Sequence, residues 1–469
     1  MKRLSNATLA AVAAGVGVPS YDRAATKAGV VHLGPGAFHR AHQAAAFDTL
    51  LAHDPRWGIT GVSLHSTSVA DALNPQHGLY TLALLDEAIS YRVIGSIKRV
   101  LTAHDGTAVL ATLADADTRI ISLTVTEKGY CLSGDGTLDM DHAGIVRDLS
   151  GDMPTTAIGW IVAGLAKRKH LRLPGVTVLS CDNLASNGRK LGAAVRLFAE
   201  ARDADLARWI EDNVRFPNAM VDSITPATDD ALRARVASAI EVEDSWPIQR
   251  EGFTQWVIED DFAGERPELD RAGVTFTNDV HGYEAAKLRL LNGPHSTLAY
   301  LGLGLGLGHA SVAAAMADPK LAAFIERLMR EDIAPSLTPP AGFDIDAYIT
   351  AILKRFANPA IEHKLSQIAW DGSQKLPYRI LDTIRDALTA GRPIDRLAVP
   401  IAAWLRFIAR AAATGERITD PLADRLLAAG GDWRAILVMR EIFGSLSSDP
   451  RFLVPVERAH AALADPDDY

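Results

Sequence analysis

The stretch Gly29–Arg40, GVVHLGPGAFHR, decides the fold of the first half of the chain. A β-branched run, Val30–Leu33, leads directly into two glycines, and a helix-forming segment follows them. Glycines between a first strand and a helix let the backbone approach a pyrophosphate at the helix N-terminus. We therefore expect a Rossmann-type nucleotide-binding domain. Its candidate cofactor-binding residues are Gly34, Gly36, Ala37, Phe38, His39 and Arg40.

Two elements of the usual dinucleotide fingerprint are missing. His39 stands where the third glycine is expected, so a tight strand–helix turn without a ligand remains an alternative. After the next strand run the chain reads Leu64–Ser68, LHSTS, with no acidic residue to bind the adenosine ribose and no arginine for a 2′-phosphate. The choice between NAD and NADP stays open, and we favour NAD.

The predicted secondary-structure pattern changes near residue 280. Before it, β-branched runs at 29–33, 58–64, 119–126 and 176–180 alternate with helical segments at 37–52, 107–114 and 186–203, a pattern typical of α/β sheets. The N-terminal segment, 1–22, is interpreted as a first helix. From Tyr283 onward helical periods dominate, at 310–317, 319–330, 346–356, 378–390, 397–414 and 420–429. We predict an NAD(P)-binding domain over 1–280 and a mostly α-helical substrate-binding and catalytic domain over 281–469.

Composition excludes several classes of protein. The 469 residues carry 48 Lys and Arg against 57 Asp and Glu, a net charge of −9, which argues against a general nucleic-acid binder. Two cysteines exclude a disulfide framework and a four-cysteine zinc site. No metal site is expected, because no Cys or carboxylate completes the set His32, His39 and His42, which we interpret as solvated or phosphate-facing. We expect a cytoplasmic protein without a membrane span.

The segment Tyr283–His295, YEAAKLRLLNGPH, carries the candidate catalytic residues. On an α-helix Lys287, Asn292 and His295 share one broad face, but Lys287 and His295 lie about 12 Å apart along the axis. Pro294 cannot donate a backbone hydrogen bond, so the helix must bend or restart there. Such a kink brings the three polar side chains closer together. A plain amphipathic helix with solvated charges is the alternative.

This trio suits the dehydrogenation of a secondary alcohol without a metal. A desolvated lysine can take the hydroxyl proton, and Asn and His donors can hold the developing alkoxide. Glu284, one turn before Lys287, can pass the proton to solvent. Tyr283 and Lys287 also match the Y-x-x-x-K pair of short-chain dehydrogenases, but that pair lies much nearer the glycine loop, so we regard this tyrosine as incidental.

Seven segments in order resemble the polyol-specific long-chain dehydrogenases, which include mannitol 2-dehydrogenases, arabinitol dehydrogenases and fructuronate reductases. They are GPGAFHRAHQ (34–43), TVTEKGYC (124–131), SCDN (180–183), FPNAMVD (216–222), QWVIED (255–260), the helix with Lys287, and DGSQKLP (371–377). The resemblance covers nearly the whole chain. It implies an NAD(P)-linked, metal-independent oxidoreductase acting at C2 of a linear sugar alcohol or sugar acid.

The resemblance also implies residue roles. Lys287 matches the general base, Asn183 and Asn292 match the oxyanion donors, and His295 matches a substrate-orienting residue. The remaining matches are Asp222 and Lys375, together with Asn183 and His295, for substrate binding, Glu284 for the proton relay and Glu127 beside the nicotinamide. Pro294, Ser223 and Gly252 depart from the Ser, Arg and Pro expected at their positions, which affects the expected substrate more than the reaction type.

Different segments of the chain resemble family members that act on different substrates. Residues 367–375 resemble fructuronate reductases, whereas 216–222 and 441–444 resemble mannitol 2-dehydrogenases. A hexonate needs a cation for its carboxylate, for which Lys364 and Arg379 are candidates. We predict a linear polyol converted to its ketose, as in mannitol to fructose. The alternatives are a D-mannonate oxidoreductase (fructuronate reductase) and, more weakly, a non-catalytic nucleotide-binding protein. The partner is a small sugar alcohol or sugar acid, and the chain is expected as a monomer or weak homo-oligomer.

Overall fold

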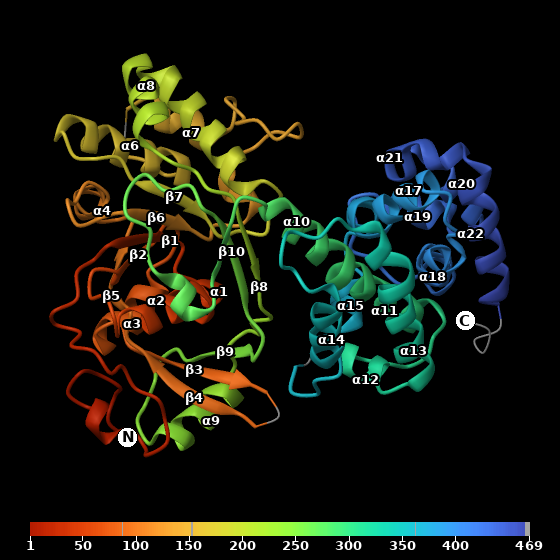
Figure 1. Cartoon of the computed structure of the whole chain (residues 1–469), viewed down its shortest axis with the longest axis horizontal. Coiled ribbons are helices and arrows are strands. Elements are labelled where there is room, and N and C mark those ends of the chain that lie inside the picture. Colours follow the sequence, from red (N-terminus) through yellow and green to blue (C-terminus); the bar gives the residue numbers. More distant parts are fainter. Residues whose placement is uncertain (87, 152, 362, 465–469) are drawn as a thin grey trace. The chain divides into compact units, whose positions relative to one another are not determined.

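The computed structural model describes residues 1–86, 88–151, 153–361 and 363–464, and the chain divides into one unit over Met1–Val280 and another over His281–Tyr469 (Figure 1). Unit 1 holds the strands, and unit 2 is helical in its described part. Residues 465–469, which the predicted second domain includes, lie outside this description.

Among the described residues, unit 1 contains a five-stranded parallel sheet of order β5–β2–β1–β6–β7. Its strands are β1 (Val30–Leu33), β2 (Ile59–Ser63), β5 (Ile97–Thr102), β6 (Ile120–Leu123) and β7 (Thr177–Ser180). All residues of β1, β6 and β7 are buried, as in a parallel sheet covered on both faces. The strand order turns back at β1, and ligands of such sheets bind at this turning point. This is the Rossmann-type arrangement that the sequence predicts.

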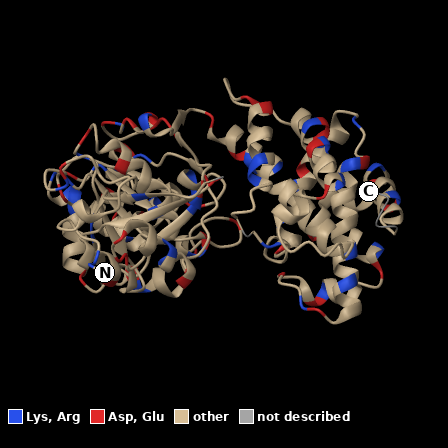
Figure 2. Ribbon diagram, turned by 90° about the horizontal axis from the view of Figure 1, so that it is seen from below, with Lys and Arg blue, Asp and Glu red and all other residues tan. Residues whose placement is uncertain are grey.

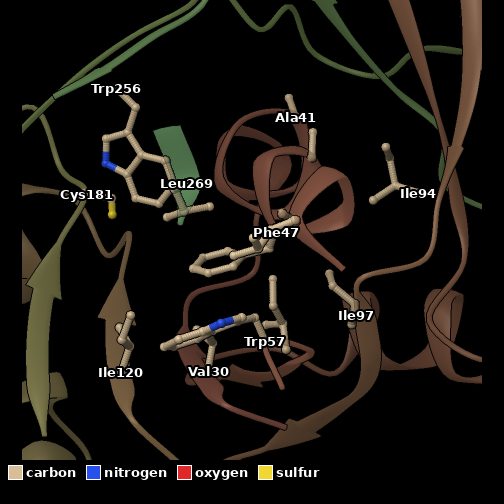
Figure 3. Packing of buried hydrophobic residues seen from close by; sticks show 14 of the residues in the cluster. Val30, Ala41, Phe47, Trp57, Ile94, Ile97, Ile120, Cys181, Trp256 and Leu269 are labelled. Carbon is tan, nitrogen blue, oxygen red and sulfur yellow. The ribbon is translucent and has the colours of Figure 1, made fainter. Parts of the chain in front are cut away.

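Helices cover both faces of this sheet. Val30 packs with Phe47 and Trp57 on one face, and Val31 packs with Trp160 on the other, because successive strand residues point to opposite sides. Figure 3 shows Phe47 between Trp57 and Trp256. The helices of unit 1 are α1 (Ala37–Ala41), α2 (Gln43–Leu50), α3 (Ser68–Leu73), α4 (Gly106–Leu113), α5 (Ala143–Leu149), α6 (Ala157–His170), α7 (Asn187–Arg202), α8 (Ala204–Asn213) and α9 (Asp230–Ile240).

In the part of the chain that the structure describes, two further sheets of three strands complete unit 1, and the sequence patterns did not predict them. One has the order β4–β3–β9, from β3 (Tyr80–Leu85), β4 (Ser90–Ile94) and β9 (Ile248–Glu251). The other has the order β11–β10–β8, from β8 (Ala219–Asp222), β10 (Gln255–Glu259) and β11 (Thr275–Thr277). Both combine antiparallel and parallel pairs.

The prediction of an N-terminal helix is wrong. Within residues 1–22 the helical structure is the short 3₁₀ turn η1 (Leu9–Ala11), and Gly15 has a φ of +92° that interrupts a helix. The segment runs beside distant strands instead: Arg3 bridges to Glu243, and the Val93 amide donates to the Gly17 carbonyl at 2.7 Å. Its backbone groups are therefore satisfied by tertiary pairing.

The helices of unit 2 include π-helical segments that continue α-helices. The α-helices are α10 (Val280–Ala286), α11 (Gly293–Gly304), α12 (Val312–Met316), α13 (Pro319–Arg327), α14 (Ile345–Phe356), α15 (Leu365–Ile368), α16 (Gly372–Leu376), α17 (Asp382–Thr389), α18 (Asp395–Thr414), α19 (Ala423–Ala429), α20 (Trp433–Leu437), α21 (Arg440–Phe443) and α22 (Pro450–Ala462). The π-helices are η5 (Lys287–Asn292), η6 (Leu328–Ile333) and η8 (Pro377–Leu381).

The core of unit 2 forms around α11 and α18. A Cβ on Gly302 would lie 2.6 Å from Leu365 Cδ1, and one on Gly304 would lie 2.5 Å from the Ala403 carbonyl, so these glycines allow close helix packing. Within the described residues, α18 is the one helix long and apolar enough to cross a membrane, and 56% of its 18-residue apolar stretch is buried inside the protein. It packs against α11 and α22, as a core helix does.

Candidate active site

The glycine loop follows β1 at the carboxyl end of the parallel sheet. Gly34 has a φ of +85°, and a Cβ on it would lie 2.3 Å from the Thr124 carbonyl oxygen, so both the conformation and the neighbouring chain require glycine. Gly36 stands at the N-terminus of α1, and the nearest atom to a Cβ there is 3.9 Å away. The two glycines therefore have different roles: Gly34 permits the turn, and Gly36 keeps open the space above the helix N-terminus.

The histidines of this segment are buried, so the expectation that they are solvated is wrong. His32 and His39 are 0% exposed and stack with ring centroids 3.4 Å apart. His32 Nδ1 lies 2.8 Å from Ser122 Oγ, and its Nε2 lies 2.9 Å from Thr124 Oγ1. Burial lowers the pKa of His32 to about 3 and that of His39 well below its usual range. Both imidazoles are therefore neutral packing groups.

The Arg40 side chain is also buried, at 1% exposure. Its Nη1 donates to the Trp246 carbonyl at 2.9 Å, and its guanidinium lies over the rings of Trp246 and Tyr80 at 5.0 and 5.5 Å. Of the predicted cofactor residues after the glycines, Ala37 and Phe38 are half-buried, whereas Arg40 and His39 face the interior. This leaves the backbone of α1 and the Gly36 position as the accessible part of the loop.

Asp182, which sequence reasoning did not select, connects the loops at the carboxyl ends of β6 and β7. Its carboxylate accepts hydrogen bonds from the Val125 and Thr126 amides at 3.0 and 2.9 Å and from the Tyr130 hydroxyl at 2.8 Å. Burial raises the pKa of Asp182, and these donors act against the rise. The carboxylate thereby brings together the loops that carry exposed Glu127 and exposed Asn183.

Asn187 makes a second connection, from the β7 loop to β8. Its Nδ2 donates to the carbonyls of Asp182 and Ala219 at 3.0 and 2.7 Å, and its Oδ1 accepts from the Ala219 amide at 2.9 Å. Asp222 ends β8 and is 6% exposed. The neighbouring Ser223, where the sequence resemblance leads us to expect arginine, donates its hydroxyl to the Phe253 carbonyl at 3.0 Å.

In unit 2, one continuous helical run carries Glu284, Lys287, Asn292 and His295. It changes from α10 to the π-helix η5 at Lys287 and back to α11 at Gly293. Pro294 lies in the first turn of α11 directly after η5. It cannot donate a backbone hydrogen bond to the preceding turn, yet the helical run continues through it. In a π-helix hydrogen bonds join residues five apart, the spacing of Lys287 and Asn292, which places these residues on adjacent turns.

The acid–base candidates on this run are buried. Lys287 is 8% exposed and Glu284 is 9% exposed, unusual values for charged side chains. His281, exposed one turn earlier, lies 3.8 Å from the Glu284 carboxylate. The Tyr283 ring packs edge-on against Phe343, with the ring centroids 5.2 Å apart.

His295 sits among aromatic rings and cations. Its ring centroid lies 4.2 Å from that of Phe356 and 5.0 Å from that of His363. Burial, with the charges of Arg355 and Arg379 and the His363 imidazole, holds the pKa of His295 well below its usual range. A neutral imidazole can donate one hydrogen bond and accept another, which suits the orientation of a hydroxyl.

The remaining predicted residues of unit 2 lie on α16 and nearby. Lys375 Nζ donates to the Trp370 carbonyl at 2.7 Å and lies 3.6 Å from the Asp371 carboxylate, and burial lowers the pKa of Lys375. Arg379, on η8, donates to Ser296 Oγ at 3.0 Å, and its Nε is buried without a hydrogen-bond partner. Lys364 is exposed at the start of α15.

Among the described residues, no group of three or more His, Cys, Asp or Glu side chains is placed so that it could hold a metal ion. Glu127, Asn183 and Asp222 belong to unit 1, and Glu284, Lys287, Asn292, His295 and Lys375 belong to unit 2. Within each unit, the candidates gather on connected loops or on packed helices.

Two domain models of one known protein family together match most of the chain. Residues 28–271 match the mannitol dehydrogenase Rossmann domain, and residues 279–464 match the mannitol dehydrogenase C-terminal domain. The chain belongs to the mannitol dehydrogenase family. This confirms the family resemblance and the fold class, and it makes the protein an NAD(P)-linked dehydrogenase of CH–OH groups.

Relatives of this mannitol dehydrogenase family protein include mannitol 2-dehydrogenases and a D-mannonate oxidoreductase. A mannitol 2-dehydrogenase of Phaeosphaeria nodorum is 40% identical over 463 residues, covering 96% of this chain and 81% of its own. The D-mannonate oxidoreductase of Escherichia coli is 43% identical over 398 residues, covering 83% of this chain and 82% of its own. A solved ternary complex of Pseudomonas fluorescens mannitol 2-dehydrogenase with NAD and D-mannitol is 38% identical, with a TM-score of 0.83, covering 99% of this chain and 97% of its own.

Proposed function

We propose that this protein interconverts a linear polyol and its ketose with NAD, in the manner of mannitol and fructose, and without a metal. The observation that carries the proposal is a buried lysine, Lys287, five residues before Asn292 on a π-helix. The solved relative with NAD and D-mannitol matches nearly the whole chain, which supports both the cofactor and the substrate class.

The glycine loop fits a dinucleotide. A Cβ on Gly36 would project into open space at the N-terminus of α1, where backbone amides and the helix dipole favour a pyrophosphate. Glu127, on the loop that Asp182 fixes, is the residue we assign to the nicotinamide end. When bound, NAD accepts the hydride from the carbinol carbon.

The proton chemistry falls to the residues of unit 2. Lys287 Nζ, in its neutral form, takes the hydroxyl proton of the substrate, and Glu284 relays that proton towards solvent through the turn that bears exposed His281. The amides of Asn292 and Asn183 donate to the developing alkoxide. Asp222 and Lys375 bind further hydroxyls, and His295, kept neutral by burial, orients the reacting one.

A sugar acid is the second candidate substrate, favoured by one observation. Arg379 contributes its charge beside His295, and its Nε is buried with no hydrogen-bond partner. A bidentate guanidinium is the group that binds a carboxylate most specifically. The relative named D-mannonate oxidoreductase is consistent with this alternative.

Reduction of fructose and fructuronate, measured side by side with NADH, tests the proposal. We expect a higher kcat/KM with fructose, no loss of rate after chelator treatment, and a lower rate with NADPH. A higher kcat/KM with fructuronate would replace the polyol by the sugar acid. In that case Arg379→Gln should remove the preference for the acid, because it removes the cation while leaving Lys287 in place.

A further inference from the structure

A cavity of about 90 Å³ lies inside unit 1, separate from the glycine loop. Its walls come from α2, from strands β3, β4 and β9, from the start of β10 and from the turn at Gly273. None of its described lining residues belongs to the five-stranded parallel sheet, whose carboxyl edge carries the candidate cofactor loops.

The strand register places two arginines on one face of the β4–β3–β9 sheet. Arg92 of β4 is paired with Leu82, and Arg250 of β9 is paired with Leu84. Leu82 and Leu84 are two residues apart on β3, so their side chains share a face, and directly paired residues point to that same face. All four side chains line the cavity opposite α2.

The two arginines differ in their partners. Arg92 pairs with buried Asp48 at 2.5 Å and donates to Thr49 Oγ1 at 3.2 Å. Arg250 makes no ion pair with any described residue, and its Nε is buried without a hydrogen-bond partner. Glu251, the next residue of β9, points to the opposite face, where it accepts from the Ile224 amide at 2.6 Å.

This arrangement leaves Arg250 without an ion-pair partner among the described residues, although the charge of the neighbouring Glu251 acts on it. Burial, together with the like charge of Arg92, lowers the pKa of Arg250 to about 10, so the guanidinium remains charged at neutral pH. A half-buried charge without a partner is unfavourable and is satisfied by an anion. The planar guanidinium fork matches carboxylate and phosphate oxygens.

The size of the cavity suits a small anion. A volume of about 90 Å³ exceeds what a single water needs and has room for one oxyanion group. The hydroxyl of Thr254, which also lines the cavity, adds a neutral donor, whereas the Thr49 hydroxyl already donates to the Ala45 carbonyl. We propose that this cavity binds a small oxyanion, a phosphate or carboxylate group, between Arg92 and Arg250. The proposal is independent of the substrate assigned above.

Calorimetric titration of the full chain with inorganic phosphate tests the site. Saturating NADH keeps the glycine loop occupied, and sodium chloride holds the ionic strength constant. We expect saturable binding that Arg250→Gln weakens at least about tenfold, the equivalent of one lost charge-assisted hydrogen bond. Arg208→Gln, at an exposed arginine of the same unit, should leave binding unchanged. Sulfate and acetate, titrated in the same way, distinguish a phosphate-type from a carboxylate-type ligand.

Thermal unfolding gives a second, independent readout. Without added oxyanion, Arg250→Gln should unfold at or above the wild-type temperature, since it removes an unpaired charge. Added oxyanion should raise the wild-type midpoint above that of the variant. Equal affinities of wild type and Arg250→Gln, or no saturable binding of phosphate, sulfate or acetate, would overturn the proposal. A lower midpoint of the variant in oxyanion-free buffer would overturn it as well, because the guanidinium would then have a partner within the protein.

Discussion

At the scale of single residues, burial divides the charged groups into those that pack and those proposed to react. Arg40 is buried, with its Nη1 donating to a backbone carbonyl and its guanidinium lying over two aromatic rings. Lys287 is buried on a π-helix, an irregular winding that is frequent at functional sites. The proposed base is therefore singled out by its element as well as by its residue type.

Lys287→Ala should lower turnover by about 10²–10⁴, the usual contribution of a positioned acid–base group. Affinity for NADH, measured by fluorescence titration, should stay within about twofold, because the glycine loop is untouched. Lys320→Ala, at an exposed lysine of the same unit, is the matched control and should retain full turnover. Wild-type turnover in Lys287→Ala would remove the base assignment.

At the scale of elements, the loop between β1 and α1 shows that neighbouring glycines can serve different ends. Gly34 adopts a left-handed conformation against the Thr124 carbonyl, whereas Gly36 faces open space. The sequence motif does not distinguish the two glycines. In the structure, the backbone conformation requires glycine at position 34, whereas a glycine at position 36 leaves space for a ligand.

The pair Gly34→Val and Gly36→Val tests this separation. Gly34→Val should lower the free energy of unfolding by about 2 kcal/mol or more, because a β-branched residue is strained at positive φ and clashes with the carbonyl. Gly36→Val should keep wild-type stability in urea but bind NADH at least tenfold more weakly. Should Gly36→Val bind NADH normally, the loop would be only a turn.

Local patterns predicted the elements that depend on local sequence. Continuous β-branched runs located β1, β2, β6 and β7, and the long helical period located α7. Strand β9 was missed because its pairing with β3 joins segments far apart in the chain. Strands β3 and β4 are neighbours in the sequence, and their short runs were not recognised as a hairpin. The N-terminal segment was mistaken for a helix because its partners, near Glu243 and Arg92, are equally distant.

The candidate site follows the same division. Lys287, Asn292 and His295 were recognised on one helix because spacing and Pro294 are visible in sequence. Asp182 was missed, although it lies in a recognised motif, since its role depends on amides of a loop more than fifty residues earlier. The burial of His39 likewise depends on its stacking with His32 of the preceding strand.

At the scale of the whole molecule, the charged side chains are interspersed, and the histidines with lowered pKa values are buried. Acidic and basic residues are interspersed over both units in Figure 2, in keeping with the modest net charge of −9. The pH dependence of the free energy of unfolding comes instead from buried imidazoles. His32 and His39 lie in unit 1 and His295 in unit 2, all with lowered pKa values.

Stability should therefore fall in mild acid. The unfolded chain protonates these histidines below about pH 6.5, whereas the folded chain does not, so the unfolded state binds more protons. Each buried histidine lowers the free energy of unfolding by about 1.4 kcal/mol per pH unit from pH 6.5 downward, and for His32 this continues to about pH 3. Urea midpoints measured between pH 7.5 and 5 check this. A flat profile would mean that the imidazoles are solvated.

The placement of the cysteines has a practical consequence for kinetics. Cys131 and Cys181, the two cysteines of the sequence, both lie in unit 1, both are buried, and burial raises the pKa of each thiol. Alkylation needs an exposed thiolate, so labelling must wait until unit 1 opens. The rate of thiol labelling under native conditions then reports the opening of unit 1 alone. This measurement needs no engineered probe.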